Sequence, residues 1–467
     1  MPPLTVKTLL AGGSELKDIT VKGWIRTRRD SKSCSFAELN DGSARENLQL
    51  IFSAENGDFS ALLPGLLTGA AVAVTGDLVA APEGARQKLE LRVKKAELYG
   101  ECDPDKYPIQ KKKTSDEFLR TVAHLRPRTN KYAAMLRIRS ELSFAIHNYF
   151  RNNGFFYVHT PIITGSDCEG AGQMFSVSSL DLSNSAALPK TDNNAIDFSK
   201  DFFGKKTYLT VSGQLEGETL ALALGKIYTF GPTFRAENSN TYRHCAEFWM
   251  IEPEMAFYEL DDDMALAEDF VKSITRHTLE HCAEDIELFA RFVDPALMET
   301  LRNVADSAYE RLAYGDAVKI LEPNNSKFEV KVSWGVDLAS EHERFLTENY
   351  FKKPVILYNK PKDAAAFYMK LNDDGRTVRG MDLLVQRIGE LIGGSERENR
   401  LDVLEKKMAD FKINPESYWW YLDLRRFGSV PHSGFGLGFE RMMMLVTGIS
   451  NIRDVTAYPR VPGWAEF

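Results

Sequence analysis

Three glycines at every second position near the C-terminus constrain the fold of this chain more than any other feature. Gly434, Gly436 and Gly438 precede a Glu-Arg pair and an apolar stretch in the run His432–Gly448 (HSGFGLGFERMMMLVTG). A strand with alternate glycines has one face without side chains, so a planar ligand can lie against its backbone. The spacing matches neither a phosphate-binding P-loop nor a dinucleotide fingerprint. The run therefore predicts a strand and then a helix at the wall of a ligand site, with a glycine-rich turn as the alternative.

The front of the chain reads as a series of short strands separated by turns. Between residues 16 and 99 the pattern predicts strands at Ile19–Ile25, Leu48–Phe52, Val72–Leu78 and Lys88–Tyr99. Short strands at such close spacing are typical of a small barrel. Among small barrels, the five-stranded OB type binds single-stranded nucleic acid on one face.

The pattern changes after a lysine-rich stretch. A run with helical spacing of apolar residues predicts a helix at Ala133–Asn153 that ends at Gly154. The next run, Phe155–Thr164, predicts an interrupted edge strand because Pro161 has no backbone N–H to donate. The further elements predicted are strands at Lys205–Val211, Glu247–Glu252, Pro354–Tyr358 and Phe367–Leu371, helices around Asp262–His281 and Ser395–Lys412, and an exposed excursion at Asp181–Lys206. Because they follow no regular βαβ order, we expect an α+β body on a largely antiparallel sheet.

Composition and charge indicate the compartment of the protein and the kinds of partner that it can bind. The five cysteines among 467 residues are scattered and form no CxxC pair, which predicts reduced thiols and a cytoplasmic protein. The net charge is −8 overall, with +2 on residues 1–113 and −10 on the rest, so a polyanion is expected to meet only the front of the chain. The apolar stretch Gly65–Val74 is too short to cross a membrane, and no membrane partner is expected.

A second motif, Phe234–Glu254 (FRAENSNTYRHCAEFWMIEPE), predicts two strands joined by a charged loop. Arg235 and Glu237 are expected on one face of the first strand, with Arg243 and His244 in the loop. Guanidinium groups bind phosphate oxygens bidentately, so this set suits a triphosphate. A surface network of ion pairs is the alternative.

Taken in order, the helix with Pro161, the charged hairpin and the glycine strand resemble the signature motifs of class II aminoacyl-tRNA synthetases. The front barrel, with GWIRTRRD, is similar to that of the subgroup that contains the aspartyl, asparaginyl and lysyl enzymes. The resemblance spans essentially the whole chain. It implies an OB-fold anticodon-binding domain at 1–100, a hinge at 101–125 and a class II catalytic domain at 126–467, on an antiparallel sheet flanked by helices. It also implies a homodimer across the Pro161 region.

The resemblance implies that ATP is a substrate and assigns residues to it. Arg235 is expected on the α-phosphate, with Arg243 and His244 on the β- and γ-phosphates. Phe248 and Arg441 are expected on the two faces of the adenine, with Glu237 beside it. The complete ATP-binding set is Arg235, Glu237, Arg243, His244, Phe248, Gly438 and Arg441.

The resemblance also implies catalytic Mg2+. Glu390, in the run GELIGGSERENR, is expected to bind the ion with Asp382 as a second carboxylate, and Glu390 joins Arg235 and Arg441 as a catalytic residue. Asp382 and Glu390 are eight residues apart where aspartyl relatives show seven, and Gly393 stands where some relatives have a serine ligand. The number of Mg2+ ions therefore stays open.

The run Val211–Glu218 (VSGQLEGE) bears on the amino acid. Aspartyl enzymes carry a lysine at the position of Gly217, where it balances the carboxylate of the substrate. A buried unpaired carboxylate costs several kcal/mol, whereas a carboxamide needs only hydrogen-bond partners. Together with His124–Asn130 (HLRPRTN), the run resembles bacterial asparaginyl-tRNA synthetases. These enzymes activate L-asparagine with ATP to asparaginyl-adenylate and transfer it to the 3′ end of tRNA(Asn), releasing pyrophosphate and AMP.

The same resemblance assigns an asparagine-binding set. Glu252 is expected to accept from the carboxamide NH2, Arg397 to donate to its oxygen, and Glu169 to bind the α-amino group. The complete set is Glu169, Ser212, Gln214, Glu252, Arg397 and His432.

The barrel is expected to bind the tRNA anticodon. Phe36 should stack on a base and Gln49 should contact a base edge, while Arg26, Arg28 and Arg29 should meet phosphates or base edges. A place in the barrel core is the alternative for Phe36.

Three other functions remain to be weighed. An aspartyl-tRNA synthetase, discriminating or relaxed, is disfavoured by Gly217. An ammonia-dependent asparagine synthetase on the same catalytic fold would lack the barrel predicted at residues 16–99. An RNA-binding regulator without activity would have no use for Arg235, Glu390 and Arg441 together.

Overall fold

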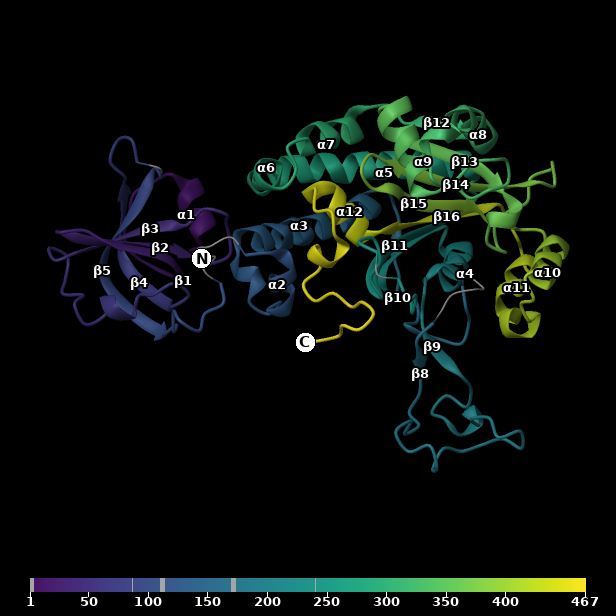
Figure 1. Ribbon diagram of the computed structural model, residues 1–467, viewed down its shortest axis with the longest axis horizontal. Helices are drawn as coiled ribbons and strands as arrows, with labels where there is room; N and C mark the ends of the chain where they lie inside the picture. The colour runs from purple at the N-terminus through teal and green to yellow at the C-terminus, as the bar shows by residue number, and fades with distance from the viewer. Residues whose placement is uncertain (1–3, 86, 110–113, 169–173, 240) are drawn as a thin grey trace. The chain divides into compact units, whose positions relative to one another are not determined.

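The computed structural model describes residues 4–85, 87–109, 114–168, 174–239 and 241–467 (Figure 1). The chain divides into two compact units, Met1–Ala134 and Met135–Phe467. Among the described residues, no helix is both long enough and apolar enough to cross a membrane.

The N-terminal unit is a closed five-stranded barrel with the strand order β1-β2-β3-β5-β4. Its elements are α1 (Val6–Gly12), β1 (Leu16–Asp30), β2 (Cys34–Asn40), β3 (Leu48–Ser53), β4 (Ala71–Ala80) and β5 (Leu89–Gly100). Only β3 and β5 pair in parallel; the other neighbours are antiparallel. The predicted barrel is confirmed, although the strand pattern missed β2 because its polar positions obscure the alternation.

The alternation of side chains along each strand builds the barrel core. In β2, Ala37 and Leu39 are buried, while Phe36 and Glu38, which alternate with them, are half-buried. In β5, Leu91 and Val93 follow the same rule. Alternate residues of a strand point to opposite faces, so one face fills the barrel and the other remains available to a ligand.

The C-terminal unit is built on an eight-stranded sheet with the order β12-β13-β14-β15-β16-β11-β10-β6. A separate three-stranded sheet has the order β7-β9-β8. The strands are β6 (Phe156–Tyr157), β7 (Ile163–Thr164), β8 (Ser176–Val177), β9 (Thr207–Leu209), β10 (Lys226–Phe234), β11 (Glu247–Ala256), β12 (Glu310–Ala313), β13 (Val355–Pro361), β14 (Thr377–Val385), β15 (Gly389–Glu396) and β16 (His432–Gly438). From β13 through β14, β15, β16 and β11 to β10, neighbouring strands are antiparallel, whereas the outer pairs β12–β13 and β10–β6 are parallel. This largely antiparallel sheet confirms the predicted α+β class.

Helices flank this sheet. In the C-terminal unit they are α3 (Asn130–Asn152), α4 (Gln214–Leu224), α5 (Leu260–His281), α6 (Ala283–Phe292), α7 (Leu297–Asp306), α8 (Tyr314–Leu321), α9 (Ser340–Arg344), α10 (Leu401–Asp410), α11 (Trp419–Arg426) and α12 (Phe439–Thr447), whereas α2 (Asp116–Thr121) belongs to the N-terminal unit. The short 3-10 turns are η1 (Leu63–Gly65), η2 (Arg126–Arg128), η3 (Phe198–Lys200), η4 (Glu322–Lys327), η6 (Lys362–Ala364), η7 (Pro415–Tyr418) and η8 (Ile452–Asp454), and η5 (Phe345–Tyr350) is a π-helical turn. Helix α5 packs against β14, β15 and β16.

Several predicted elements are confirmed. Helix α3 ends at Asn152, and Gly154 follows it with a φ of +76°. The run with Pro161 forms two short strands, β6 at the edge of the large sheet and β7 in the small one. The excursion at Asp181–Lys206 is largely exposed and extends from the β8–β9 hairpin away from the large sheet (Figure 1).

Two predicted elements are wrong. Phe367–Leu371 forms no strand and makes only isolated bridges through Met369 and Leu371, because Phe367 is fully buried among tyrosines of the α11 region. The helix expected around Ser395–Lys412 begins only at Leu401, since Ser395 continues β15. In both cases the tertiary contacts override the local pattern.

The close packing of β4 against β5 predicts one sensitive position in the barrel. A side chain at Gly76 would collide with the backbone carbonyl of Arg92, at a shift in the strand register. We expect Gly76→Ala to lower the free energy of unfolding by about 1–3 kcal/mol, because overpacked sites force the backbone to move. Hydrogen exchange of the barrel strands would measure the loss. Gly100→Ala is the control, because its new methyl group would meet only ordinary contact with Ala71; equal effects of the two substitutions would contradict this account.

Candidate active site

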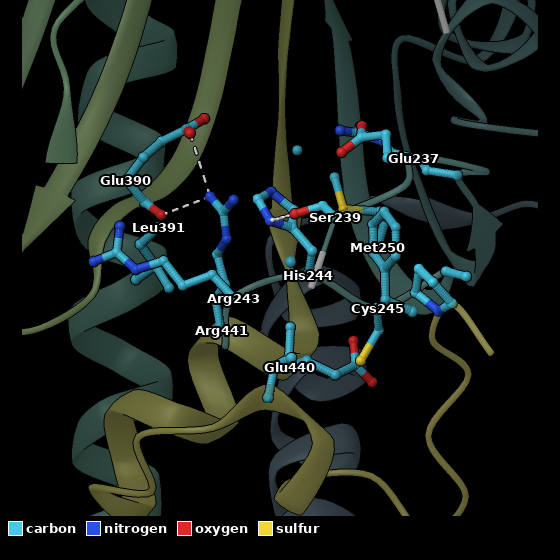
Figure 2. Close-up of a pocket in the computed structure, with 17 residues that line it drawn as sticks. Glu237, Ser239, Arg243, His244, Cys245, Met250, Glu390, Leu391, Glu440 and Arg441 are labelled. Atoms are coloured by element: carbon cyan, nitrogen blue, oxygen red, sulfur yellow. Dashed lines mark hydrogen bonds and ion pairs between the residues drawn. The ribbon is translucent and has the colours of Figure 1, made fainter. Parts of the chain in front are cut away.

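A cavity at the start of α12 brings together every residue of the predicted ATP-binding set (Figure 2). The predicted residues that line it are Arg235, Glu237, Arg243, His244, Phe248, Glu390, Gly438 and Arg441. These residues come from β11, β15, β16 and α12 and from the loop between β10 and β11. The same wall contains Met250, Cys245 and Glu440, to which the sequence analysis gave no role.

The hairpin differs in one respect from its prediction. Strand β10 ends at Phe234, so Arg235 and Glu237 lie in the loop and do not share a strand face. The return strand β11 does carry Phe248 as expected, and the Arg235 guanidinium lies 5.4 Å from the centre of the Phe248 ring.

The glycine strand β16 makes room for side chains of β11 as well as for a ligand. A side chain at Gly434 would collide with the Glu254 carboxylate, and one at Gly436 would lie 2.6 Å from the methyl group of Met250. Gly436 and Gly438 line the cavity, whereas Gly434 does not. The predicted strand and helix are confirmed, but only part of the bare strand face is open to a ligand.

The cavity is positively charged on the phosphate side. Burial lowers the pKa of His244 below its usual value, and the guanidinium groups of Arg441, Arg235 and Arg243 act in the same direction against the opposing carboxylate of Glu237. His244 is held by Thr241, whose Oγ1 lies 2.6 Å from Nδ1. A neutral imidazole surrounded by arginines can donate to a phosphate oxygen without adding further charge.

Arg441 connects the cationic side of the cavity to the acidic side. Its Nη1 donates to the backbone oxygen of Glu390 at 2.8 Å and lies 3.3 Å from Oε2 of the same residue (Figure 2). Although partial burial opposes the charged form, Arg441 and Lys360 lower the pKa of Glu390. Glu390 is therefore an anion in the range in which most enzymes work.

The acidic side holds two groups that sequence reasoning missed. Lys360 Nζ lies 2.7 Å from Oδ2 of Asp382, and Glu343 accepts a hydrogen bond from the backbone N–H of Glu390 at 3.3 Å. Burial raises the pKa of Asp382 to about 6, with Lys360 opposing and Glu390 adding to the shift. Burial and the carboxylates of Glu390 and Asp382 also raise the pKa of Glu343 to about 7. Neither Lys360 nor Glu343 lies in a sequence motif from which a place near Asp382 and Glu390 could have been predicted.

Asp382 and Glu390 converge on Gly393. A Cβ atom at Gly393 would lie 2.9 Å from Glu390 Oε1 and 3.8 Å from Asp382 Oδ1. No group of three or more acidic, His or Cys side chains arranged to hold a metal was found in the described part of the chain. Mg2+ is commonly held by one or two carboxylates together with substrate phosphates, so these two residues suit the ion only beside a bound nucleotide.

Glu252, a member of the predicted asparagine-binding set, lies on β11 and is already well bonded. Its carboxylate accepts from Ser212 Oγ, from Gly213 N at 3.0 Å and from Thr229 Oγ1 at 3.0 Å. Glu252 is 5% exposed, so this set of donors holds its oxygens in place. Glu169 of the predicted set lies outside the described residues.

Arg397 pairs with Glu254, which lies two residues along β11 from Glu252 of the predicted asparagine-binding set. Arg397 Nη2 lies 2.5 Å from Oε1 and Nε lies 3.2 Å from Oε2 of Glu254. Although burial opposes the charged form, Glu254 and Glu218 raise the pKa of Arg397 above its usual range. The sequence gave no role to Glu254, whose partner lies 143 residues away along the chain.

Glu218 is the centre of a second buried cluster. It accepts from Tyr421, from Arg425 Nη2 at 3.0 Å and from Gln214 Nε2 at 3.1 Å, and His432 Nε2 lies 2.9 Å away. Although burial opposes its charge, Arg425 and His432 lower the pKa of Glu218 below its ordinary value. Gln214 and His432 of the predicted set therefore meet through a carboxylate that the prediction did not include.

Gly217 lies between these two clusters. Outside its chain neighbours, the described residues within 4 Å of a Cβ built there are Ile227, at 3.5 Å, and Glu254, whose Cγ is at 3.6 Å. No lysine or arginine of the described residues fills that space. The surroundings of Gly217 are thus consistent with the sequence argument that no cation takes the place of the lysine found in aspartyl enzymes.

The five residues predicted to bind the anticodon lie in the N-terminal unit and fall into two groups. Arg29, Phe36 and Gln49 lie on the outer side of β1, β2 and β3, and the Arg29 guanidinium is 4.8 Å from the centre of the Phe36 ring. Phe36 is outside the core cluster of the barrel, which argues against the core alternative. Arg26 and Arg28 instead donate to main-chain oxygens within the unit.

Residues 115–462 match the family described as tRNA synthetases class II (D, K and N), and residues 19–99 match the OB-fold nucleic acid binding domain. The asparagine-tRNA ligase of Nitratidesulfovibrio vulgaris is 60% identical over 449 residues, which cover 96% of each chain. That of Nostoc sp. is 54% identical over 462 residues, 99% of each chain. The chain belongs to the asparagine-tRNA ligase family of class II.

The three-dimensional structure agrees with this family. It is similar to the crystal structure of asparaginyl-tRNA synthetase from Pyrococcus horikoshii complexed with asparaginyl-adenylate, with a TM-score of 0.84, 31% identity and 99% of both chains covered. The predicted family, the OB-fold barrel and the class of enzyme, an aminoacyl-tRNA ligase, are thereby confirmed. The aspartyl alternative is less well supported, since the matched ligases at 54–60% identity are named for asparagine.

The cluster around Glu218 yields a prediction on stability. Replacing Glu218 by Gln removes the negative charge opposite Arg425, which is fully buried at the side-chain level. We expect the free energy of unfolding to fall by about 3 kcal/mol or more, because a buried cation is left without its counter-ion. Chemical denaturation, with hydrogen exchange of α4 and α11, would measure the loss. Glu216→Gln on the same helix is the matched control, and the account is wrong if the two variants are equally destabilised.

Proposed function

We propose that this chain attaches L-asparagine to tRNA(Asn) in two ATP-dependent steps, with the cavity of Figure 2 as the ATP site. One observation carries the proposal: all the ATP-binding residues expected from the sequence line one cavity. Matched ligases named for asparagine support it.

In the first step, an α-carboxylate oxygen of asparagine attacks the α-phosphorus of ATP in line. The new P–O bond forms as the bond from the α-phosphorus to the bridging oxygen of the β-phosphate breaks, and pyrophosphate leaves. No general base is needed, because the carboxylate is already a nucleophile. Catalysis then comes from positioning and charge neutralisation by Arg235 at the α-phosphate, Arg243 and His244 at the β- and γ-phosphates, and Arg441.

Asp382 and Glu390 would hold Mg2+ in this reaction. When bound, the ion would neutralise negative charge on the phosphates. Lys360 occupies one oxygen of Asp382, which leaves the other oxygen directed toward Gly393 and Glu390. The number of ions stays open, because Glu343 brings a third carboxylate close to the same place.

In the second step, a ribose hydroxyl at the 3′ end of tRNA attacks the carbonyl carbon of asparaginyl-adenylate. The ester bond forms, the bond to the phosphate oxygen breaks and AMP leaves. The barrel would bind the anticodon on the face that presents Arg29, Phe36 and Gln49, where an unstacked base can lie against the aromatic ring.

Selection of asparagine over aspartate would depend on the absence of an uncompensated cation. Arg397 has its charge matched by Glu254, and Arg425 has its charge matched by Glu218. A substrate carboxylate would add a further negative charge to this buried set, whereas a carboxamide adds none. A carboxylate can accept about four hydrogen bonds, so Glu252 with its three present donors could accept one more from the carboxamide NH2.

We also propose a cytoplasmic homodimer. Large apolar side chains are exposed on α3 and on the segment that contains Pro161, and an exposed apolar surface of this kind is typical of a subunit interface. These residues are Phe144, Phe156, Tyr157, Ile162 and Ile163.

Pyrophosphate exchange tests the function directly. With ATP and labelled pyrophosphate, we expect asparagine to support exchange and aspartate to support it at least about 100-fold less, since burying an unpaired carboxylate costs several kcal/mol. Stronger exchange with aspartate would overturn the choice of amino acid.

A pair of variants at Gly217 isolates the charge. Gly217→Lys should shift the preference toward aspartate, because the ammonium group enters the space beside Glu254, and Gly217→Met supplies similar bulk without charge. If the two variants show the same ratio of asparagine to aspartate exchange, selection does not depend on charge at this position.

The barrel face generates a separate prediction. Phe36→Ala should raise the KM for tRNA in aminoacylation by roughly tenfold, because stacking of one base is worth about 1–3 kcal/mol. Pyrophosphate exchange, which needs no tRNA, should be unchanged. Phe36→Tyr keeps the ring and should retain most of the tRNA affinity, whereas equal loss of both activities in Phe36→Ala would assign Phe36 to the barrel core.

A further inference from the structure

Helix α9 (Ser340–Arg344) touches the phosphate side of the cavity from outside the family motifs. It lies between the charged hairpin and the glycine strand in the sequence, in a stretch to which no chemistry was assigned, and it packs against β15. Its first residue, Ser340, accepts a hydrogen bond through Oγ from Arg243 Nη1 at 2.7 Å. The helix therefore makes direct contact with a residue of the ATP-binding set.

The docking of α9 is close and specific. Gly389, the first residue of β15, has a φ of +78°, and a side chain there would collide with the Glu343 carboxylate and lie 3.5 Å from Arg243 Nη1. Glu343, on the same helix, accepts from the backbone N–H of Glu390 at 3.3 Å. Arg243 is thus enclosed between α9 and the start of β15, and Figure 2 shows its side chain extending toward Leu391 on that side of the cavity.

Arg243 needs such support because it stands in a long loop between β10 and β11. A free arginine side chain has many rotamers, and ordering it on ligand binding costs conformational entropy. A hydrogen bond to Nη1 uses one of the five N–H donors of the guanidinium, so the others remain able to bind phosphate oxygens. The nearby Glu343 carboxylate attracts the Arg243 guanidinium and so favours the position in which Ser340 holds it.

We propose that Ser340 is a positioning residue for ATP, which holds the Arg243 guanidinium in the orientation that binds the β- and γ-phosphates. The inference rests on the proposed function, in which Arg243 contacts those phosphates. Ser340 itself touches no substrate and acts only through Arg243.

Steady-state pyrophosphate exchange tests this role. Ser340→Ala should raise the KM for ATP by roughly tenfold or more, as expected for one lost hydrogen bond to a charged group, with the KM for asparagine unchanged. Ser340→Thr keeps the hydroxyl and should restore the KM for ATP. Arg344→Ala is the matched control, since Arg344 is exposed on the same helix and its Nε lies 3.4 Å from the main-chain oxygen of Ser340, so that the change leaves the Ser340 hydroxyl in place.

A double-mutant cycle separates positioning from a merely structural effect. In an Arg243→Ala background, Ser340→Ala should cause no further rise in the KM for ATP, because the residue through which it acts is gone. A KM for ATP that is unchanged in Ser340→Ala, or that rises by the same factor in both backgrounds, would overturn the proposal.

Calorimetric binding of ATP without amino acid keeps this test independent of the proposed function. The affinity of Ser340→Ala for ATP should be lower than that of the unmodified chain by the same factor. If the unmodified chain shows no exchange with asparagine, the proposed function fails while the affinities still decide the role of Ser340. If Arg243→Ala leaves the affinity unchanged, the phosphate contact of Arg243 is wrong and the inference about Ser340 falls with it.

Discussion

The arrangement of the catalytic unit depends on pairing of charges that are removed from water. Arg397 and Arg425 are almost completely buried, and a buried cation is stable only with a carboxylate and further hydrogen bonds around it. Glu254 from β11 and Glu218 from α4 supply those carboxylates. The Glu218–Arg425 pair joins α4 to α11, and His432 beside Glu218 connects this cluster to β16. The Glu254–Arg397 pair joins β11 to the residue that follows β15. The contacts that neutralise the arginines therefore also hold these elements together, among the residues proposed to bind the amino acid.

Small residues make this pairing possible. Gly434 leaves the space that the Glu254 carboxylate occupies, and Gly217 adds no side chain between Ile227 and Glu254. The glycine strand was interpreted from the sequence as a platform for a planar ligand, and the structure divides that role. Its outer part, at Gly436 and Gly438, lines the cavity of Figure 2, whereas at Gly434 it leaves room for the Glu254 carboxylate. One sequence pattern thus serves the ligand at one end and the buried ion pair at the other.

The groups that sequence reasoning identified are those that stand in short, ordered motifs. The charged hairpin and the glycine strand each concentrate several functional residues within about twenty positions, and local pattern was sufficient to find them. Glu218, Lys360 and Glu343 escaped notice because each is a single charged residue whose partner is distant in the sequence. The strand expected at Phe367–Leu371 failed for a related reason, since burial of Phe367 in a cluster of side chains determines the backbone there.

The eight-residue spacing between Asp382 and Glu390 shows how strand register can preserve a site when the sequence changes. The pairing of β14 with β15 shifts by one residue between Leu383 and Leu384. Leu383 pairs with Ile392 and Leu384 pairs with Glu390, so Leu391 is the additional residue of a bulge. A bulge of this kind accommodates one extra residue and redirects the neighbouring side chain. Asp382 pairs directly with Gly393, and the bulge allows Glu390 to reach the same point from the other side. The departure in spacing therefore lies in the strand pairing, and the two carboxylates still converge.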